Sequence, residues 1–203
     1  LPSSAEHPYL RIRLAGGRVV ETNLVGSYNA DNVMAALAVG QHFGVSLEEG
    51  VKAIETYVPS NNRSQMTRTG RNTLIIDAYN ANPTSMAAAL ENFSNVEASC
   101  KVALLGDMLE LGEESLDEHV AVILSAASRG FDKVCFVGKE FMKAAAEAGF
   151  ASCCADAGNG GCILFFETSD ALAEWLRSEP LSGATVLIKG SRGTRMEKTV
   201  PAL

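Results

Sequence analysis

Beyond residue 63 the chain alternates short apolar runs with amphipathic segments, and this alternation constrains the fold more than any other feature of the sequence. Short apolar runs are typical of buried strands, whereas apolar residues spaced three or four apart, such as Leu116, Val120 and Ile123, are typical of helices. Repeated strand and helix units build a mainly parallel sheet with helices on both faces, so we predict a Rossmann-like α/β domain. The expected strands span 73–78, 101–106, 133–138, 162–166 and 185–189, and the expected helices span 84–94, 113–129, 139–148, 168–177 and 195–200.

The first segment, about residues 1–60, has a different pattern. Residues 9–14 alternate apolar and basic side chains and 19–25 return as a second apolar run, which predicts a β-hairpin. Two helices follow, and Ser46 with Glu49 forms a capping box before the second. Two strands and two helices bury little surface, so we expect this segment to be the tail of a larger domain. The positions expected to be buried on its helices are Ala30, Val33, Met34, Leu37 and Ala38, then Leu47, Val51, Ile54 and Val58.

A polar turn follows the first expected strand of the α/β domain. It carries Asp77, Tyr79, Asn80 and Asn82 directly before an amphipathic helix. Carboxyl ends of parallel strands that face helix starts bind nucleotides and substrates, because the helix N-terminus offers unpaired N–H groups and a partial positive charge. Asn82 has a second interpretation, as the N-cap of a helix whose first residue is Pro83. Both interpretations of Asn82 remain open on the sequence alone.

Two more loops after expected strands carry unusual residues. The loop after 101–106 holds Asp107 and Glu110, which could act as an acid/base pair or as magnesium ligands. Their spacing favours a simpler role, in which they cap the helix expected to start near Glu113. The loop after 185–189 is hinged by glycines and rich in cations and hydroxyls, which suits a carboxylate or phosphate, although a solvated surface turn would look the same. Its candidate ligands are Lys189, Ser191 and Arg192.

Composition excludes several classes of protein. A hydrophobic content of 47% with 20% charged residues is typical of a packed globular protein. The net charge of -7 and the lack of a dense basic cluster argue against a nucleic-acid partner. We expect no membrane span and no signal peptide. The five cysteines lack the spacing of a zinc site or a redox pair, so we expect them to be reduced in a cytoplasmic protein. They are Cys100, Cys135, Cys153, Cys154 and Cys162.

The sequence contains no phosphate-binding P-loop. The pair Gly138 and Lys139 is followed by Glu140 and lacks the preceding glycine loop that the motif needs. We therefore predict no cradle for nucleotide phosphates within this chain by itself, and we assign no catalytic residue and no metal ligand to it.

Four motifs resemble those of the Mur ligase family. They occupy residues 77–86, 105–112 and 186–192 and, upstream, residues 26–36, where Tyr28 replaces the histidine usual in that family. The resemblance covers nearly the whole chain. It implies that residues 1–62 are the β-hairpin and helix tail of the central ATPase domain, and that 63–203 form the Rossmann-like C-terminal domain. The P-loop, the magnesium ligands and a modified lysine would belong to a part of the ligase outside this chain.

By this resemblance the longer protein is an ATP-dependent ligase of bacterial cell-wall synthesis, with ATP and Mg²⁺ as cofactors. It would join D-alanyl-D-alanine to UDP-N-acetylmuramoyl-tripeptide through an acyl phosphate, as a cytoplasmic monomer without a nucleic-acid or membrane partner. The fragment alone would be inactive. Three alternatives stay open: another amino-acid ligase of the family, the more distant folylpolyglutamate synthase, or a non-catalytic module that binds a nucleotide or peptide.

The resemblance also implies roles for individual residues. An adenine contact is implied for Asn29, supported by Asn32, although Asn29 could instead be the N-cap of a helix at 30–39. Arg63 would reach the ATP phosphates. The implied nucleotide-binding set is Asn29, Asn32, Arg63, Asp77, Tyr79 and Asn80. The implied substrate-binding set is Asn82, Asp107, Glu110, Lys189, Ser191 and Arg192.

One geometric expectation underlies all these assignments. Because the carboxyl ends of parallel strands share one edge of a sheet, Asp77, Asp107 and Lys189 should gather along a single rim. Asn29 and Arg63 should lie close to that rim.

Overall fold

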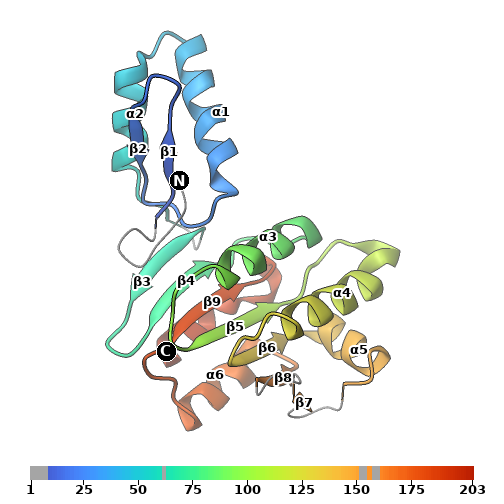
Figure 1. The fold of residues 1–203 in the computed structure, drawn as a ribbon. Coiled ribbons are helices and arrows are strands. Elements are labelled where there is room, and N and C mark those ends of the chain that lie inside the picture. The colour runs from blue at the N-terminus through green and yellow to red at the C-terminus, as the bar shows by residue number, and fades with distance from the viewer. Residues whose placement is uncertain (1–8, 61–62, 151–154, 157–160) are drawn as a thin grey trace.

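The computed structural model describes residues 9–60, 63–150, 155–156 and 161–203 (Figure 1). Its main element is a seven-stranded sheet with the order β3-β4-β9-β5-β6-β8-β7. The five central strands run parallel to one another, whereas β3 and β7 are antiparallel to their neighbours. The mainly parallel sheet expected from the sequence is therefore confirmed. Its strands are β3 (Gln65–Arg68), β4 (Thr73–Asp77), β5 (Lys101–Gly106), β6 (Lys133–Val137), β7 (Ala155–Asp156), β8 (Cys162–Phe166) and β9 (Thr185–Lys189).

Helices cover both faces of this sheet, as the strand and helix alternation predicts. The helices α3, α4 and α5 pack on one face, and α6 and the 3₁₀ segment η3 pack on the other. Alternate residues of each strand serve the two cores: Ile75 of β4 belongs to the first core, and Leu74 and Ile76 belong to the second. The segments are α3 (Pro83–Ser94), η1 (Gly112–Glu114), α4 (Ser115–Ala127), α5 (Lys139–Glu147), α6 (Ser169–Ser178), η2 (Arg192–Thr194) and η3 (Met196–Ala202).

The edge strand β3 was not expected. It directly follows residues 59–64, the polar, turn-rich stretch between the two segments, which we call the linker. It pairs with β4 from Gln65 opposite Ile76 to Arg68 opposite Thr73. Polar and charged residues are common on edge strands, because only one side of such a strand is paired. Two helix boundaries also differ, since the expected helix at 113–129 begins with a 3₁₀ turn and the expected helix at 195–200 is itself a 3₁₀ segment.

The first segment folds as expected, with β1 (Arg11–Arg13), β2 (Val19–Glu21), α1 (Asn29–His42) and α2 (Leu47–Thr56). The capping box is present, because the Ser46 hydroxyl accepts from the Glu49 backbone N–H at 3.2 Å and the Ser46 N–H donates to the Glu49 carboxylate at 3.1 Å. Figure 1 shows this unit beside the β3 edge of the main sheet. It has a small core of its own, made of Leu10, Val20, Val33, Leu37 and Val51.

The expected apolar faces of α1 and α2 are only partly buried. Val33, Leu37 and Val51 are buried, but Met34, Ala38, Leu47 and Val58 are exposed, contrary to the sequence expectation. The apolar core that α1 joins is formed with α2 and the hairpin, and it is small enough that α1 buries only a narrow apolar stripe in it. No helix in the described ranges is both long and apolar enough to cross a bilayer.

Replacing Leu104 with Ala is expected to lower the free energy of unfolding by about 2–5 kcal/mol, because this fully buried side chain of β5 would leave a cavity. Denaturant unfolding followed by the fluorescence of Trp175 measures the loss, since the lone tryptophan packs against the same core. The matched control is Leu124→Ala, at a position 53% exposed on α4, which should change stability by less than about 0.5 kcal/mol. Equal losses would contradict the assignment of the core.

Candidate functional site

The polar loops that follow β4, β5 and β9 lie together at one edge of the sheet, which we call the rim. The strands β4, β9 and β5 are neighbours, and their register places Asp77 opposite Lys189 and Lys189 opposite Leu105. The backbone N–H of Ser191 donates to the Asp107 carbonyl at 3.0 Å, so the loops after β9 and β5 are in direct contact. The expectation that Asp77, Asp107 and Lys189 share a rim is thus confirmed.

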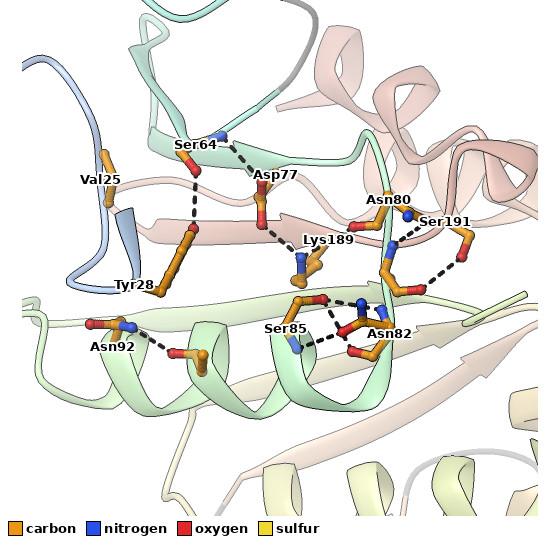
Figure 2. A network of polar contacts seen from close by, with 12 residues as sticks. Val25, Tyr28, Ser64, Asp77, Asn80, Asn82, Ser85, Asn92, Lys189 and Ser191 are labelled. Carbon is orange, nitrogen blue, oxygen red and sulfur yellow. Dashed lines mark hydrogen bonds and ion pairs between the residues drawn. The ribbon is translucent and has the colours of Figure 1, made fainter. Parts of the chain in front are cut away.

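A buried ion pair lies at the centre of the rim. The Lys189 ammonium is 2.7 Å from Oδ2 of Asp77, and the Lys189 side chain is only 2% exposed (Figure 2). The ammonium also donates to the Asn80 carbonyl at 3.3 Å. A buried cation needs partners of this kind, because its desolvation is otherwise uncompensated. The Lys189 ammonium therefore binds groups of the rim itself, and this geometry does not favour the contact with the dipeptide that was expected for it.

The linker joins this ion pair to the first segment. The second oxygen of Asp77 accepts from the Ser64 backbone N–H at 3.2 Å, and the Ser64 hydroxyl lies 3.1 Å from the Tyr28 hydroxyl (Figure 2). Burial, followed by the charge of Asp77, raises the pKa of Tyr28 to about 12. The phenol stays protonated at neutral pH and can take part in this hydrogen-bond chain as a neutral group.

Asn29 lies beside the same linker residue. Its side-chain N–H₂ group donates to the Val25 carbonyl at 2.8 Å and to the Ser64 hydroxyl at 3.1 Å, and its oxygen accepts from Asn32 at 3.2 Å. Asn32 therefore contacts Asn29 as expected. The alternative in which Asn29 caps the helix is wrong, because α1 begins at Asn29 itself and Tyr28 occupies the N-cap position.

Asn82 caps a helix, as its second interpretation proposes. Its side-chain oxygen accepts from the Ser85 N–H at 2.8 Å, while the Ser85 hydroxyl accepts from the Asn82 N–H at 3.1 Å, and Pro83 is the first residue of α3. Asn80 is exposed, and its side-chain oxygen accepts from the Ala81 N–H at 2.9 Å. The side-chain N–H₂ groups of both amides can face a ligand, because Asn80 and Asn82 are exposed and these contacts use only their side-chain oxygens.

Two exposed arginines converge on one tyrosine. The guanidinium carbon of Arg63 lies 3.6 Å from the centre of the Tyr79 ring, and that of Arg192 lies 5.6 Å from it. A hydrogen bond to Arg63 and the charges of Arg63 and Arg192 lower the pKa of Tyr79. The sequence predicts a cationic site at the loop after β9, formed by Lys189 and Arg192. The structure places Arg192 there, but the second exposed cation is Arg63 of the linker, because Lys189 is buried.

Asp107 caps a helix other than the expected one. Its carboxylate accepts from the N–H groups of Glu140 at 3.1 Å and Phe141 at 2.9 Å, so it caps α5 rather than the helix near Glu113. A side chain at Gly138 would collide with this carboxylate, so the close approach requires glycine there. Asp107 is 5% exposed, which leaves the exposed Glu110 as the carboxylate of this loop that can face a ligand.

Two buried side chains hold the loops of the rim in place. The Ser191 hydroxyl accepts from the Leu109 N–H at 2.9 Å and donates to the Ala81 carbonyl at 3.3 Å. His119, fully buried, accepts at Nε2 from the Met108 N–H at 3.0 Å, while its Nδ1 faces the Ser115 carbonyl at 2.6 Å. Ser191 therefore fixes the loop geometry through hydrogen bonds that occupy its hydroxyl.

The part of the chain that the structure describes contains no cluster of side chains arranged as metal ligands. Among residues 9–60, 63–150, 155–156 and 161–203, no group of three or more His, Cys, Asp or Glu side chains is placed to hold a metal ion.

A comparison with models of protein families shows to which family the chain belongs. The family model described as Mur ligase, glutamate ligase domain, matches residues 62–192. The chain belongs to the Mur ligase family. The fold class predicted from the sequence agrees with this membership, and the alternating β and α elements are those of other Mur ligases.

Named relatives of this Mur ligase chain point to one branch of the family. The UDP-N-acetylmuramoyl-tripeptide–D-alanyl-D-alanine ligase of Treponema pallidum is 35% identical over 188 residues, which cover 92% of this chain and 39% of the relative. The enzyme of the same name from Escherichia coli is 32% identical over 181 residues, covering 89% of this chain and 38% of the relative. The chain thus spans about two fifths of the length of these curated relatives.

Solved structures give the same picture. A crystal structure of MurF from Acinetobacter baumannii has a TM-score of 0.76 and 29% identity, and the match covers 95% of this chain and 41% of that one. A UDP-N-acetylmuramate-alanine ligase from Thermotoga maritima has a TM-score of 0.64 with 15% identity, so that likeness concerns the fold alone.

The ion pair of this Mur ligase chain is testable by a double-mutant cycle. Lys189→Met should lower the free energy of unfolding by about 3 kcal/mol, because it leaves the Asp77 carboxylate without its buried partner. Adding Asp77→Asn should cost less than it does in the wild-type background, with an interaction energy of about 1–3 kcal/mol. Urea unfolding of the four proteins measures this energy. Strictly additive losses would contradict the coupling of the two side chains.

A pH series tests Asp107. Burial raises the pKa of this carboxyl, so the folded chain holds the proton more tightly than the unfolded chain does. The contribution of Asp107 to wild-type stability should therefore fall as the pH rises from about 4, the ordinary pKa of the group, through its raised pKa. Asp107→Asn lacks this loss, so the unfolding free energy of the variant minus that of wild type should increase with pH across this window. A difference that stays constant or decreases would contradict the raised pKa.

Proposed function

We propose that the chain is the C-terminal part of an ATP-dependent ligase that adds D-alanyl-D-alanine to UDP-N-acetylmuramoyl-tripeptide in peptidoglycan synthesis. The observation that carries this proposal is the match of about nine tenths of the chain to relatives with that name at 31–35% identity. Among the solved structures, MurF chains match at 19–29% identity and ligases named for other substrates at 13–16%, which disfavours another amino-acid ligase as the alternative.

We propose that residues 1–62 end the central ATPase domain and that 63–203 form the C-terminal domain. The separate small core of the first segment supports this division. So do the exposed large apolar side chains of α1, α2 and the residues that directly follow each helix, since such patches mark surfaces that pack against other protein. These side chains are Met34, Val39, Phe43, Val45, Leu47, Tyr57 and Val58.

The rim supplies groups that fit an adenine nucleotide and a peptide carboxylate. Arg63 and Arg192 offer two exposed guanidinium groups for phosphate or carboxylate oxygens, which Arg binds in bidentate fashion. Asn29, Asn32, Asp77, Tyr79 and Asn80 are proposed to meet the adenosine. Of the proposed substrate contacts, Asn82, Glu110 and Arg192 are exposed, whereas Asp107, Lys189 and Ser191 are buried and engaged in hydrogen bonds that hold the rim together.

The proposed reaction has two steps. ATP transfers its γ-phosphoryl group to the free carboxylate of the tripeptide and leaves as ADP. The dipeptide amine then attacks the acyl carbon, loses a proton to solvent and displaces inorganic phosphate as the amide forms. The arginines of this chain would stabilise the negative charge of the anionic groups, and closure of the domains would exclude water. The described residues offer no ligand set for Mg²⁺, so this cofactor would be held by the remainder of the ligase. We expect the ligase to act as a monomer in the bacterial cytoplasm.

Phosphate release tests the proposed activity. The longer protein should release phosphate from ATP only when UDP-N-acetylmuramoyl-tripeptide and D-alanyl-D-alanine are both present, and this chain alone should release none. Replacing Arg63 or Arg192 with Ala in the longer protein should lower kcat/KM by roughly tenfold or more, because each removes a charge-assisted contact. Arg68→Ala is the matched control, since Arg68 is exposed at the opposite end of β3. Turnover with a single amino acid in place of the dipeptide would favour another Mur ligase activity, and turnover by this chain alone would refute its fragment character.

A further inference from the structure

The Asn29 side chain has no spare N–H donor. It is buried, and both hydrogens of its amide group are used, one by the Val25 carbonyl at 2.8 Å and the other by the Ser64 hydroxyl at 3.1 Å. Its oxygen accepts one bond from Asn32 at 3.2 Å and can accept a second. Asn29 is therefore fully committed as a donor and only half committed as an acceptor.

Adenine recognition by an asparagine needs both functions. The amide oxygen accepts from the exocyclic amino group of the base while the amide nitrogen donates to a ring nitrogen. Asn29 can supply the acceptor without change, but it must give up one of its two donor contacts. The bond to Ser64 is the longer of the two, and its partner is 35 residues away in the linker, whereas Val25 lies only four residues before Asn29.

We infer that Ser64 is a positioning residue that competes with an adenine nucleotide for the Asn29 amide. This inference rests on the proposed function, in which Asn29 meets adenine. In the arrangement described here the linker hydroxyl occupies the donor that the base needs, and binding of the base displaces it.

The surroundings of Ser64 make this exchange possible at low cost. The Ser64 hydroxyl keeps a second hydrogen-bond partner, the Tyr28 hydroxyl at 3.1 Å, when Asn29 turns away. The Ser64 backbone is held by Asp77, which keeps the linker residue at the rim (Figure 2). Ser64 also has a left-handed φ of 44°. Occupation of the adenine site is thereby coupled to the linker between the two segments.

Nucleotide titration of single variants tests the competition. Ser64→Ala removes the competing hydroxyl but keeps the backbone bond to Asp77, so ADP should bind about threefold to tenfold more tightly than to wild type. The matched control is Ser27→Ala, which removes a different hydroxyl contact between the segments, the bond to Asn92 at 2.8 Å, and should leave ADP affinity unchanged. Isothermal titration of this chain and of the longer protein gives both affinities. Equal tightening in the two variants would overturn the inference, because it would reflect general loosening.

A third variant separates the inference from the proposed function. Asn29→Ala should weaken ADP binding and abolish the effect of Ser64→Ala, and the side-chain amide signal of Asn29 in NMR spectra should move when ADP is added. If Asn29→Ala weakens binding while Ser64→Ala does not tighten it, the competition is wrong and the adenine assignment stands. Weaker binding, or no binding, of ADP to Ser64→Ala also overturns the competition. If neither substitution changes the affinity, both the inference and the adenine role of Asn29 fail.

Discussion

The ion pair between Asp77 and Lys189 is the interaction on which the rim depends. The two residues end neighbouring parallel strands, and their contact joins the polar turn after β4 to the loop after β9. The Asp77 carboxylate also holds the Ser64 backbone, so the linker is positioned by the same charge. A buried pair of this kind contributes little net stability, but the loss of one partner is costly, which favours a single arrangement of the surrounding loops.

Most polar side chains of the rim are used to build it rather than to face a ligand. Asn82 and Asp107 cap helices, and Ser191 ties three loops together. The groups that remain exposed are the Tyr79 cluster with its two arginines, the amide groups of Asn80 and Asn82, and the carboxylate of Glu110. This division of labour explains how a loop-built site can be rigid, because its internal hydrogen bonds preorganise the few groups left to recognise a substrate.

The sequence predicts the sheet and its helices well, since each central strand is a short apolar run between amphipathic segments. It misses β3, because the polar residues of an edge strand are indistinguishable from a linker. The helix capped by Asp107 was also predicted wrongly, since the carboxylate acts across 33 residues on α5 rather than on the next helix. Ser64 had no local signal at all: its importance comes from contacts with Tyr28, Asn29 and Asp77, which only the fold brings together.

The antiparallel pairing of β3 has a mechanical consequence. Four consecutive residues, Gln65 to Arg68, pair with β4, so the backbone is fixed to the sheet immediately after the linker. Any swing of the hairpin and its two helices must then pivot before Gln65, because bending further along would break the ladder. The edge strand thus fixes the C-terminal end of the linker. A rotation of the first segment relative to the sheet would have to come from backbone torsions before Gln65, close to the Tyr79 cluster.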